Sequence, residues 1–279
     1  MISYGELINA LNSKRLESVK LLFNNGADVN AKVCSKQTPL HIACRHGTIE
    51  IVKYLVEEKG ADVNATDKFG EPLLYTACEF RHLDMMKYLI EKGVDVNVND
   101  KYGHVPLHIA CEYGTINMVK YLVEKGADIH AKDTYEVTPL HRACQYANLE
   151  IVKYLIEKGV DVNAKDIDGH VPLHYACEYR NLDIVKYLIE KGADVNAKNN
   201  DGFTSLHLVC LEGILEYEYL EIVEYLVEKG ADVNAEDKYG RVPLHYTRYY
   251  ENLGIIVEYL VKKGAVINPK GNFGNPVAP

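Results

Sequence analysis

One motif recurs along this chain with a period of 33 residues. Anchor tetrapeptides begin at Val105, Thr138, Val171 and Thr204, each 33 residues after the one before. The anchor reads TPLH, VPLH, TSLH or PLLY, and its copies are Thr38–His41, Pro72–Tyr75, Val105–His108, Thr138–His141, Val171–His174, Thr204–His207 and Val242–His245. A second string, GADVNA or a close relative, follows each anchor. A fixed period of roughly 20–50 residues indicates a solenoid, a propeller or an array.

Each repeat carries the signals of two helices. A proline such as Pro106 or Pro172 stands where the first helix should begin, because the first helical turn needs no N–H from that residue. The second helix has the pattern IVKYLVEKG, apolar on one face and charged on the other. A glycine such as Gly126 or Gly159 follows and predicts a left-handed helix end. The string DVNAKD then predicts a strand and a turn. One helix pair cannot bury its apolar faces alone, but stacked neighbours can.

The residue before the proline is the N-cap position of the first helix. Thr38 and Thr138 can cap this helix through the hydroxyl, whereas Val105, Val171 and Val242 have no hydroxyl to offer.

These residues resemble the ankyrin repeat. The family pattern joins a D-x-x-G turn, TPLH-x-A, a first helix, a glycine turn, I-V-x-x-L-L and G-A-D-V-N-A. One copy is met at Asp166, Gly169, Pro172, Leu173, His174, Ala176, Ile184, Val185, Leu188, Gly192, Ala193, Asp194, Val195 and Asn196. The resemblance covers roughly residues 1 to 269. It implies an all-α solenoid of stacked helix-turn-helix units with short β-turn or hairpin connections, and it says almost nothing about a particular partner.

We expect one elongated domain at residues 1–269. It divides into an N-terminal capping segment at 1–33, internal repeats one to six at 34–67, 68–100, 101–133, 134–166, 167–199 and 200–237, and a C-terminal capping repeat at 238–269, before a flexible tail at 270–279. Glu58 adds one residue to repeat one, and repeat six carries about five extra residues within 213–218. Lys36 and Glu136 replace the turn glycine, so those two turns should be less favourable.

Composition limits the classes of partner. The net charge is −9 and the pI is about 5.7, which argues against binding to duplex nucleic acid, since that needs a clustered basic face. No stretch reaches the ~20 apolar residues of a membrane span. Residues 1–30 lack the basic start and apolar run of a signal peptide. We therefore expect a cytoplasmic, intracellular protein in a reducing compartment, monomeric, with no nucleic-acid or membrane partner.

The cysteines follow the repeat. Six of the seven occupy one column, at Cys44, Cys78, Cys111, Cys144, Cys177 and Cys210. Equivalent positions in stacked helices lie roughly 8–10 Å apart, whereas a disulfide needs Cα atoms within ~7 Å. We predict reduced cysteines that act as small buried apolar residues. Cys34, in a turn, is the exception and should react early.

The spacing H-x-x-C invites a chemical interpretation. Residues three apart on a helix share a face, so each pair suggests a thiolate–imidazole nucleophile or a zinc site. The densest such cluster is Cys34, His41, Cys44 and His46. We favour a structural role, because a catalyst needs one site and not near-copies along a rod, and the resemblance implies that this histidine bonds to backbone. No P-loop, dinucleotide fingerprint, G-x-S-x-G or H-E-x-x-H motif appears. We predict no enzymatic activity, catalytic residue, cofactor or metal.

Two columns of the repeat hold the candidate binding residues, because the resemblance places partner contacts at turn tips and first-helix ends. The turn column is Ser35, Phe69, Tyr102, Tyr135, Asp168, Asp201 and Tyr239, and the helix-end column is His46, Phe80, Tyr113, Tyr146, Tyr179, Glu212 and Tyr250. Stacking would align them into an aromatic stripe with an acidic border. The predicted partner-binding residues are Phe69, Phe80, Tyr102, Glu112, Tyr113, Tyr135, Tyr146, Glu178 and Tyr179. The alternative is that duplication copied one tyrosine and the rings pack on neighbouring repeats.

The predicted function is a protein–protein interaction scaffold or adaptor. It would bind a partner protein with a basic border through its concave face and its hairpin tips. Two alternatives stay open: a structural or mechanical spacer whose faces bind nothing, and a regulatory ankyrin fragment of a larger effector or enzyme.

Overall fold

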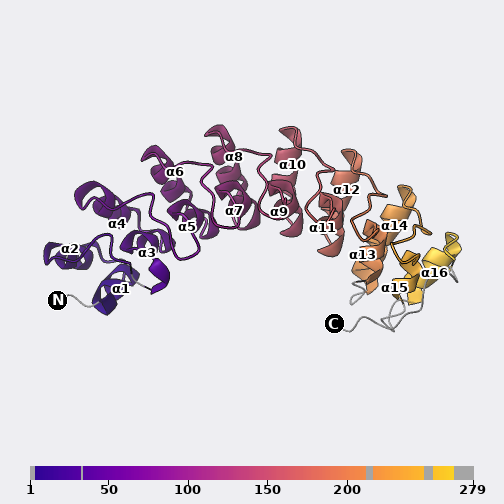
Figure 1. The fold of residues 1–279 in the computed structure, drawn as a ribbon, viewed down its shortest axis with the longest axis horizontal. Coiled ribbons are helices and arrows are strands. Elements are labelled where there is room, and N and C mark those ends of the chain that lie inside the picture. Colours follow the sequence, from indigo (N-terminus) through magenta and orange to yellow (C-terminus); the bar gives the residue numbers. More distant parts are fainter. Residues whose placement is uncertain (1–3, 33, 212–215, 248–253, 267–279) are drawn as a thin grey trace. The chain divides into compact units, whose positions relative to one another are not determined.

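The structure is a computed structural model that describes residues 4–32, 34–211, 216–247 and 254–266 (Figure 1). The chain forms two compact units, Met1–Thr134 and Tyr135–Pro279, called unit one and unit two below. The described residues form helices and loops, without a β-strand, so the predicted all-α repeat fold is confirmed. A single domain over 1–269 stays a prediction. The predicted tail at 270–279, Glu212 and Tyr250 lie outside the described residues.

Unit one contains four helix pairs. They are α1 Tyr4–Asn12 with α2 Leu16–Asn24, α3 Pro39–Arg45 with α4 Ile49–Lys53, α5 Leu73–Glu79 with α6 Leu83–Glu91, and α7 Pro106–Glu112 with α8 Ile116–Glu124. A short 3-10 turn, η1 Cys34–Lys36, precedes α3. The first helices α1, α3, α5 and α7 contact one another in chain order, which is the stacking that a solenoid requires.

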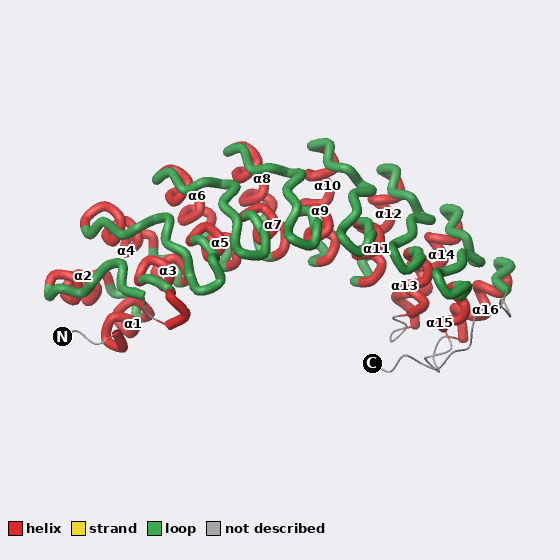
Figure 2. The backbone as a smooth tube through the Cα atoms, in the orientation of Figure 1, coloured by secondary structure: helices red, strands yellow, loops and turns green. Residues whose placement is uncertain are grey.

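Unit two repeats this arrangement. Its pairs are α9 Pro139–Gln145 with α10 Leu149–Glu157, α11 Pro172–Glu178 with α12 Leu182–Glu190, α13 Ser205–Leu211 with α14 Glu216–Glu228, and α15 Pro243–Tyr246 with α16 Gly254–Lys262. Here α9, α11, α13 and α15 contact one another in order, and so do α10, α12, α14 and α16. Figure 2 shows the loops that link one pair to the next.

The apolar faces of both helices form the core. In repeat four, Ile151, Val152 and Leu155 of α10 are fully buried, and Cys144 of α9 lies in the same layer. Burying such an aliphatic side chain stabilises the fold by roughly 1.5–3 kcal/mol. A glycine follows the second helix of each repeat, as predicted. After α10 this residue is Gly159, with φ +89°. The helix pattern read from the sequence therefore matches the packed faces.

The loops between repeats differ from the prediction. The predicted strand in DVNAKD is wrong for the described residues, where one isolated bridge joins Thr66 and Pro72. Aspartate side chains accept hydrogen bonds from backbone N–H groups of these loops instead. For example, Oδ1 of Asp161 accepts from the N–H of Asn163 at 2.9 Å. A short polar side chain that bonds its own backbone competes with strand pairing.

An asparagine ladder joins neighbouring loops. Nδ2 of Asn163 donates to the Gly192 carbonyl at 3.0 Å, and its Oδ1 accepts from the N–H of Asp194 at 2.8 Å. The same pair of bonds is made by Asn97 in unit one and by Asn196 and Asn234 in unit two. Each amide therefore holds the end of the next second helix in register.

Insertions are absorbed mainly by second helices. In repeat one, α4 continues as a π-helix, η2 Tyr54–Glu58, because a single extra residue in a helix widens one turn. In repeat six, α14 has 13 residues where α10 and α12 have nine. The insertion predicted at 213–218 therefore partly lengthens α14, and residues 212–215 lie outside the description. Lys36 and Glu136 have φ of 59° and 58°, the strained conformation expected where glycine is missing.

We expect the six column cysteines to be slow to react in the folded protein. All six are buried and none is in a disulfide, and burial raises the pKa of the Cys78, Cys177 and Cys210 thiols to about 12. A thiol reagent should modify these cysteines only after denaturant is added. Mass-spectrometric mapping checks this, and six fast thiols in the native protein would show that the column is accessible.

Replacing Asn163 by alanine should lower the free energy of unfolding by about 1–3 kcal/mol, because two hydrogen bonds are lost. The matched variant Asn163→Asp keeps the acceptor for the Asp194 N–H and loses only the donor, so it should cost less. Urea denaturation measures both. An alanine variant as stable as the wild type would mean that the ladder contributes nothing.

Candidate partner-binding surface

An aspartate or asparagine side chain builds each of five turn tips. Oδ1 of Asp67 accepts from the backbone N–H groups of Phe69 at 2.7 Å and Glu71 at 3.1 Å. This double acceptance folds the chain back within five residues and points the tip residue outward. The same geometry recurs at Asp100, Asp166, Asn199 and Asp237.

Neighbouring tips are also tied together through the backbone. The N–H of Thr134 donates to the Tyr102 carbonyl at 2.8 Å, and the N–H of Lys238 donates to the Asp201 carbonyl at 2.9 Å. Gly103 lies at such a close approach: a Cβ there would come within 3.0 Å of the Thr134 nitrogen, and its φ is +78°. The tips are thus held rigid before any partner arrives.

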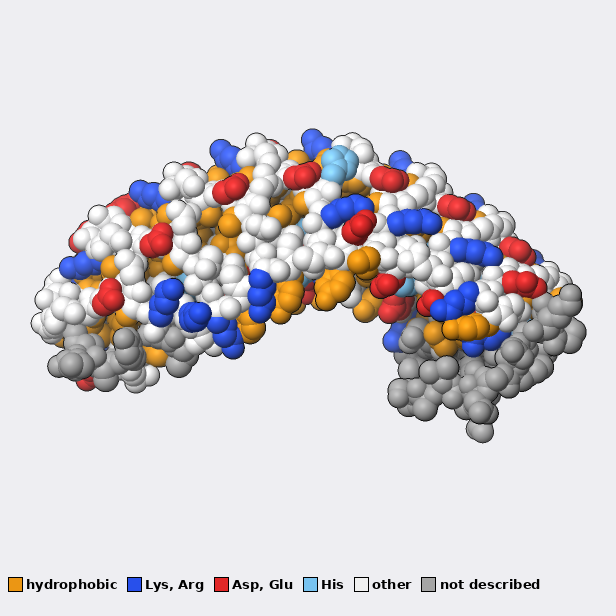
Figure 3. Space-filling model, in the orientation of Figure 1, with side chains coloured by type: hydrophobic (Ala, Val, Ile, Leu, Met, Phe, Trp, Pro, Cys, Tyr) orange, Lys and Arg blue, Asp and Glu red, His pale blue; other side chains and the backbone are white. Residues whose placement is uncertain are grey.

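The aromatic residues of the turn column are exposed. Phe69 and Tyr102 in unit one, and Tyr135 and Tyr239 in unit two, all have accessible rings. In unit one two lysines lie over them: Nζ of Lys68 is 4.5 Å from the Phe69 ring centre, and Nζ of Lys101 is 4.6 Å from Phe69 and 4.8 Å from Tyr102. Figure 3 shows Lys and Arg side chains gathered beside hydrophobic ones at the lower edge of unit one, below α5 and α7.

The helix-end column lies at the C-caps of the first helices. Phe80 follows α5, Tyr113 follows α7, Tyr146 follows α9 and Tyr179 follows α11. These residues are 39–45% exposed, so they are neither core residues nor free of contact. Phe80 stacks on His82, and the Tyr179 hydroxyl accepts from Nε2 of Gln145 at 2.8 Å. Packing and accessibility therefore coexist at this column.

In unit one the two columns border a groove of about 260 Å³. It is lined by Glu71, Tyr75, Glu79, Asp100, Tyr102, His104, Ile109, Glu112 and Tyr113. Three predicted binding residues, Tyr102, Glu112 and Tyr113, are thus brought together at one groove. Phe69 and Phe80 are not among its lining residues. Tyr135, Tyr146, Glu178 and Tyr179 belong to unit two.

Sequence reasoning missed the floor of this groove. Tyr75 is buried and donates from its hydroxyl to the His104 carbonyl. His104 also bridges two carboxylates, with Nδ1 3.0 Å from Asp100 and Nε2 3.3 Å from Asp133. Glu71 and His104 occupy the same column, two residues beyond the turn tip. Their variation from repeat to repeat is the signal that could have found them.

The hydrogen bonds and the pKa values of the H-x-x-C pairs indicate a structural role. Nδ1 of His174 accepts from the Val171 N–H at 3.0 Å, and Nε2 lies 3.1 Å from the Ala197 carbonyl of the next loop. Burial lowers the pKa of this imidazole to about 4 and raises the pKa of the Cys177 thiol to about 12. Both groups are neutral near pH 7, which opposes a thiolate–imidazolium pair.

The histidine adds a bond at the helix start that the sequence did not predict. The N–H of Thr138 donates to Nδ1 of His141 at 3.1 Å, and the Val171 N–H makes the same bond. The Thr138 hydroxyl lies 2.8 Å from that Nδ1 and accepts from the His141 N–H only at 3.4 Å. In repeats with valine at the N-cap, the imidazole therefore accepts a hydrogen bond from the valine N–H, although valine has no hydroxyl.

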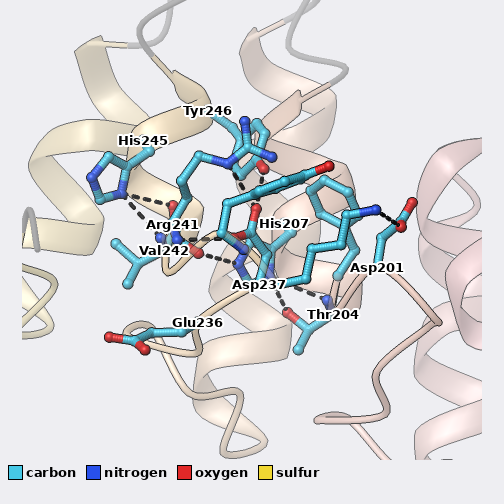
Figure 4. Close-up of polar contacts among 12 residues, drawn as sticks. Asp201, Thr204, His207, Glu236, Asp237, Arg241, Val242, His245 and Tyr246 are labelled. Atoms are coloured by element: carbon cyan, nitrogen blue, oxygen red, sulfur yellow. Dashed lines mark hydrogen bonds and ion pairs between the residues drawn. The ribbon is translucent and has the colours of Figure 1, made fainter. Parts of the chain in front are cut away.

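Figure 4 shows the polar contacts where repeat six meets the last repeat. Oδ2 of Asp237 accepts from Nε of Arg241 at 2.8 Å and from the Tyr246 hydroxyl. Nε2 of His207 lies 3.2 Å from the Arg241 carbonyl, and Lys238 pairs with Asp201. The Asp237 carboxylate thus has donors in Arg241 and Tyr246, while the contacts of His207 and Lys238 join repeat six to the last repeat.

Within the described ranges, no group of three or more His, Cys, Asp or Glu side chains is arranged to hold a metal ion. The side chain of Cys34 lies outside the description, so the Cys34–His46 cluster is not seen whole. None of the described helices has the length and apolar character needed to cross a bilayer.

The paired helices, aspartate-built turns and inter-repeat histidine bonds define a helical repeat protein. The family profile described as "Ankyrin repeats (3 copies)" matches the chain in overlapping windows, at residues 7–100, 59–133, 77–166, 107–199, 165–237 and 196–271. The chain belongs to the ankyrin-repeat family.

Two curated relatives are similar over a short stretch. Protein phosphatase 1 regulatory subunit 27 from Homo sapiens is 46% identical over 50 residues, and its Mus musculus counterpart is 48% identical over 50 residues. The stretch is 18% of this chain and 32% of each relative, so the chain spans about a third of the length of these relatives. Ankyrin repeats generally mediate protein–protein interaction, and the likeness to a regulatory subunit is consistent with an adaptor.

Stability should fall as the pH is lowered from 7.5 to 5.5. The pKa values of His41, His141, His174 and His207 are lowered by burial to about 4, whereas an unfolded histidine titrates near 6.5. The unfolded state therefore binds more protons in this window, and each histidine costs roughly 1 kcal/mol.

His170 works in the opposite direction, because its hydrogen bond to Asp166 raises its pKa. Urea midpoints across the pH range measure the net effect, and His174→Gln should flatten the slope by about one histidine's share. A stability that is constant over this range contradicts the assignment of neutral buried histidines.

Proposed function

We propose that this chain is a protein–protein interaction scaffold that binds its partner through the turn tips and first-helix ends. The observation that carries the proposal is the position of the rings at the helix ends. Phe80, Tyr113, Tyr146 and Tyr179 stay partly exposed at helix C-caps while the core beneath them is complete. Aromatic side chains on a rigid support are the residues enriched at interface centres.

The proposed binding residues are those that the sequence predicts. Unit one supplies Phe69, Phe80, Tyr102, Glu112 and Tyr113, and unit two supplies Tyr135, Tyr146, Glu178 and Tyr179. The scaffold carries out no reaction of its own and works as a monomer in a reducing compartment such as the cytoplasm. The column cysteines, which are buried and form no disulfide bond, support that compartment.

A second candidate is a regulatory segment of a larger assembly. The matched relatives are named as regulatory subunits of protein phosphatase 1. A shared stretch of 50 residues is of a length that repeats alone can supply. The catalytic subunit of protein phosphatase 1 is therefore a defined first probe. Its saturable binding to the intact chain would favour this candidate.

Replacing Tyr113 and Tyr146 together by alanine should weaken partner binding by at least ~2 kcal/mol with little change in folding. The partner is first identified by capture on the immobilised chain and mass spectrometry, and its affinity is then measured by calorimetry with the purified protein. The matched control is Tyr121→Ala with Tyr154→Ala, on the second helices α8 and α10 of the same repeats.

The result separates binding from packing. A double variant that loses stability and yet binds normally would show that these rings serve the contacts between repeats. Equal loss of binding in the second-helix control would show that the effect is not specific to the helix-end column.

A further inference from the structure

The groove of unit one is lined by both aromatic residues and carboxylates. The rings of Tyr102 and Tyr113, both partly exposed, lie on it together with the carboxylates of Glu71, Glu79 and Glu112. Its nine lining residues all lie in the described part of the chain, and none of them is a lysine or an arginine. A ring face attracts a cation, and a nearby carboxylate adds to that attraction.

The carboxylates of the groove repel one another. Burial raises the pKa of Glu71, and the charges of Asp67, Glu79 and Asp100 raise it further. Burial likewise raises the pKa of Glu79, with Glu112 adding to the shift and Arg45 opposing it. A cation placed among these groups would relieve the repulsion.

The adjoining turn tips have the opposite charge. Lys68 and Lys101 are both exposed and lie over the rings of Phe69 and Tyr102. Tyr102 belongs to both surfaces, because the Lys101 ammonium group lies over its ring and the residue also lines the groove. A basic ridge and an acidic groove therefore meet at one residue.

Two tips of unit two lack this pattern. The corresponding tip residues are Asp168 and Asp201, preceded by Ile167 and Asn200. Lys238, which precedes the next tip, lies 5.0 Å from the Tyr239 ring centre and is also paired with Asp201. In unit one, two neighbouring basic tips adjoin the acidic groove.

We propose that the groove of unit one receives a lysine or arginine side chain from an extended segment of the partner protein, while Lys68 and Lys101 pair with acidic side chains of the same segment. The proposal rests on the scaffold function proposed above and adds the charge order of the ligand. A segment with only basic residues would meet the lysine ridge, and one with only acidic residues would meet the groove.

Selection of displayed random peptides on the intact chain tests this charge order. Enriched peptides should carry a lysine or arginine with an acidic residue a few positions away. One enriched peptide is then measured by fluorescence anisotropy. Glu79→Gln with Glu112→Gln should weaken its binding about tenfold or more, and added salt should weaken it too. Lys68→Gln with Lys101→Gln should also weaken it. Glu150→Gln with Glu157→Gln, exposed on α10, is the matched control and should change nothing.

A double-mutant cycle shows whether the basic side chain sits in the groove. Replacing it by glutamine in the peptide should remove most of the difference between the wild type and the Glu79/Glu112 variant. Versions of the peptide with lysine and with arginine distinguish the two cations. The proposal is overturned by a selection without binders, by binders without a basic residue, or by additive effects in the cycle.

The two proposals fail in different ways. If Tyr113→Ala with Tyr146→Ala abolishes peptide binding while both glutamine variants bind normally, the scaffold function stands and the charge order is wrong. If the glutamine variants weaken binding and Tyr146→Ala with Tyr179→Ala, at helix ends that do not line the groove, leaves it unchanged, the groove is the site and the helix-end column of unit two is not.

Discussion

Three buried histidines, His141, His174 and His207, each join their own helix start to the next repeat through a pair of bonds. In His174, Nδ1 accepts from the Val171 N–H and Nε2 lies against the Ala197 carbonyl. The ring must be neutral to accept at one nitrogen and donate at the other. Burial keeps it neutral, so the hydrophobic layers and the polar joints stabilise each other. At the last joint, Nε2 of His207 lies 3.2 Å from the Arg241 carbonyl in the same way.

This arrangement makes the turn geometry independent of the tip side chain. The acceptor at the start of the turn is an aspartate or asparagine that bonds to backbone N–H groups, whichever residue stands at the tip. That independence explains why Phe69 is aromatic at one tip and Asp168 is acidic at another without a change in turn geometry. A rigid support with interchangeable positions is what a binding scaffold requires.

The sequence predicted the helices well, because period, proline and glycine act locally. Pro139 and Gly159 mark helix ends through backbone geometry alone. It failed at the DVNAKD loops, since a β-like pattern did not reveal that Asp161 would bond its own backbone. It did not foresee the π-helix at Tyr54–Glu58, which depends on how the helix absorbs one extra residue. Six of the nine residues that line the groove were missed, because residues such as Glu71 and His104 come together with Tyr113 only once repeats stack.

Net charge is a poor guide to what this surface binds. The value of −9 describes the whole chain, whereas Lys68 and Lys101 form a local basic ridge beside an acidic groove. Charges separated by more than about 10 Å are largely screened at ordinary salt, so a bound segment senses the nearest side chains. An acidic border alone would favour any basic partner. Alternating signs at adjoining positions favour a ligand of matching order, which is how a repeated backbone can acquire specificity from a few substitutions.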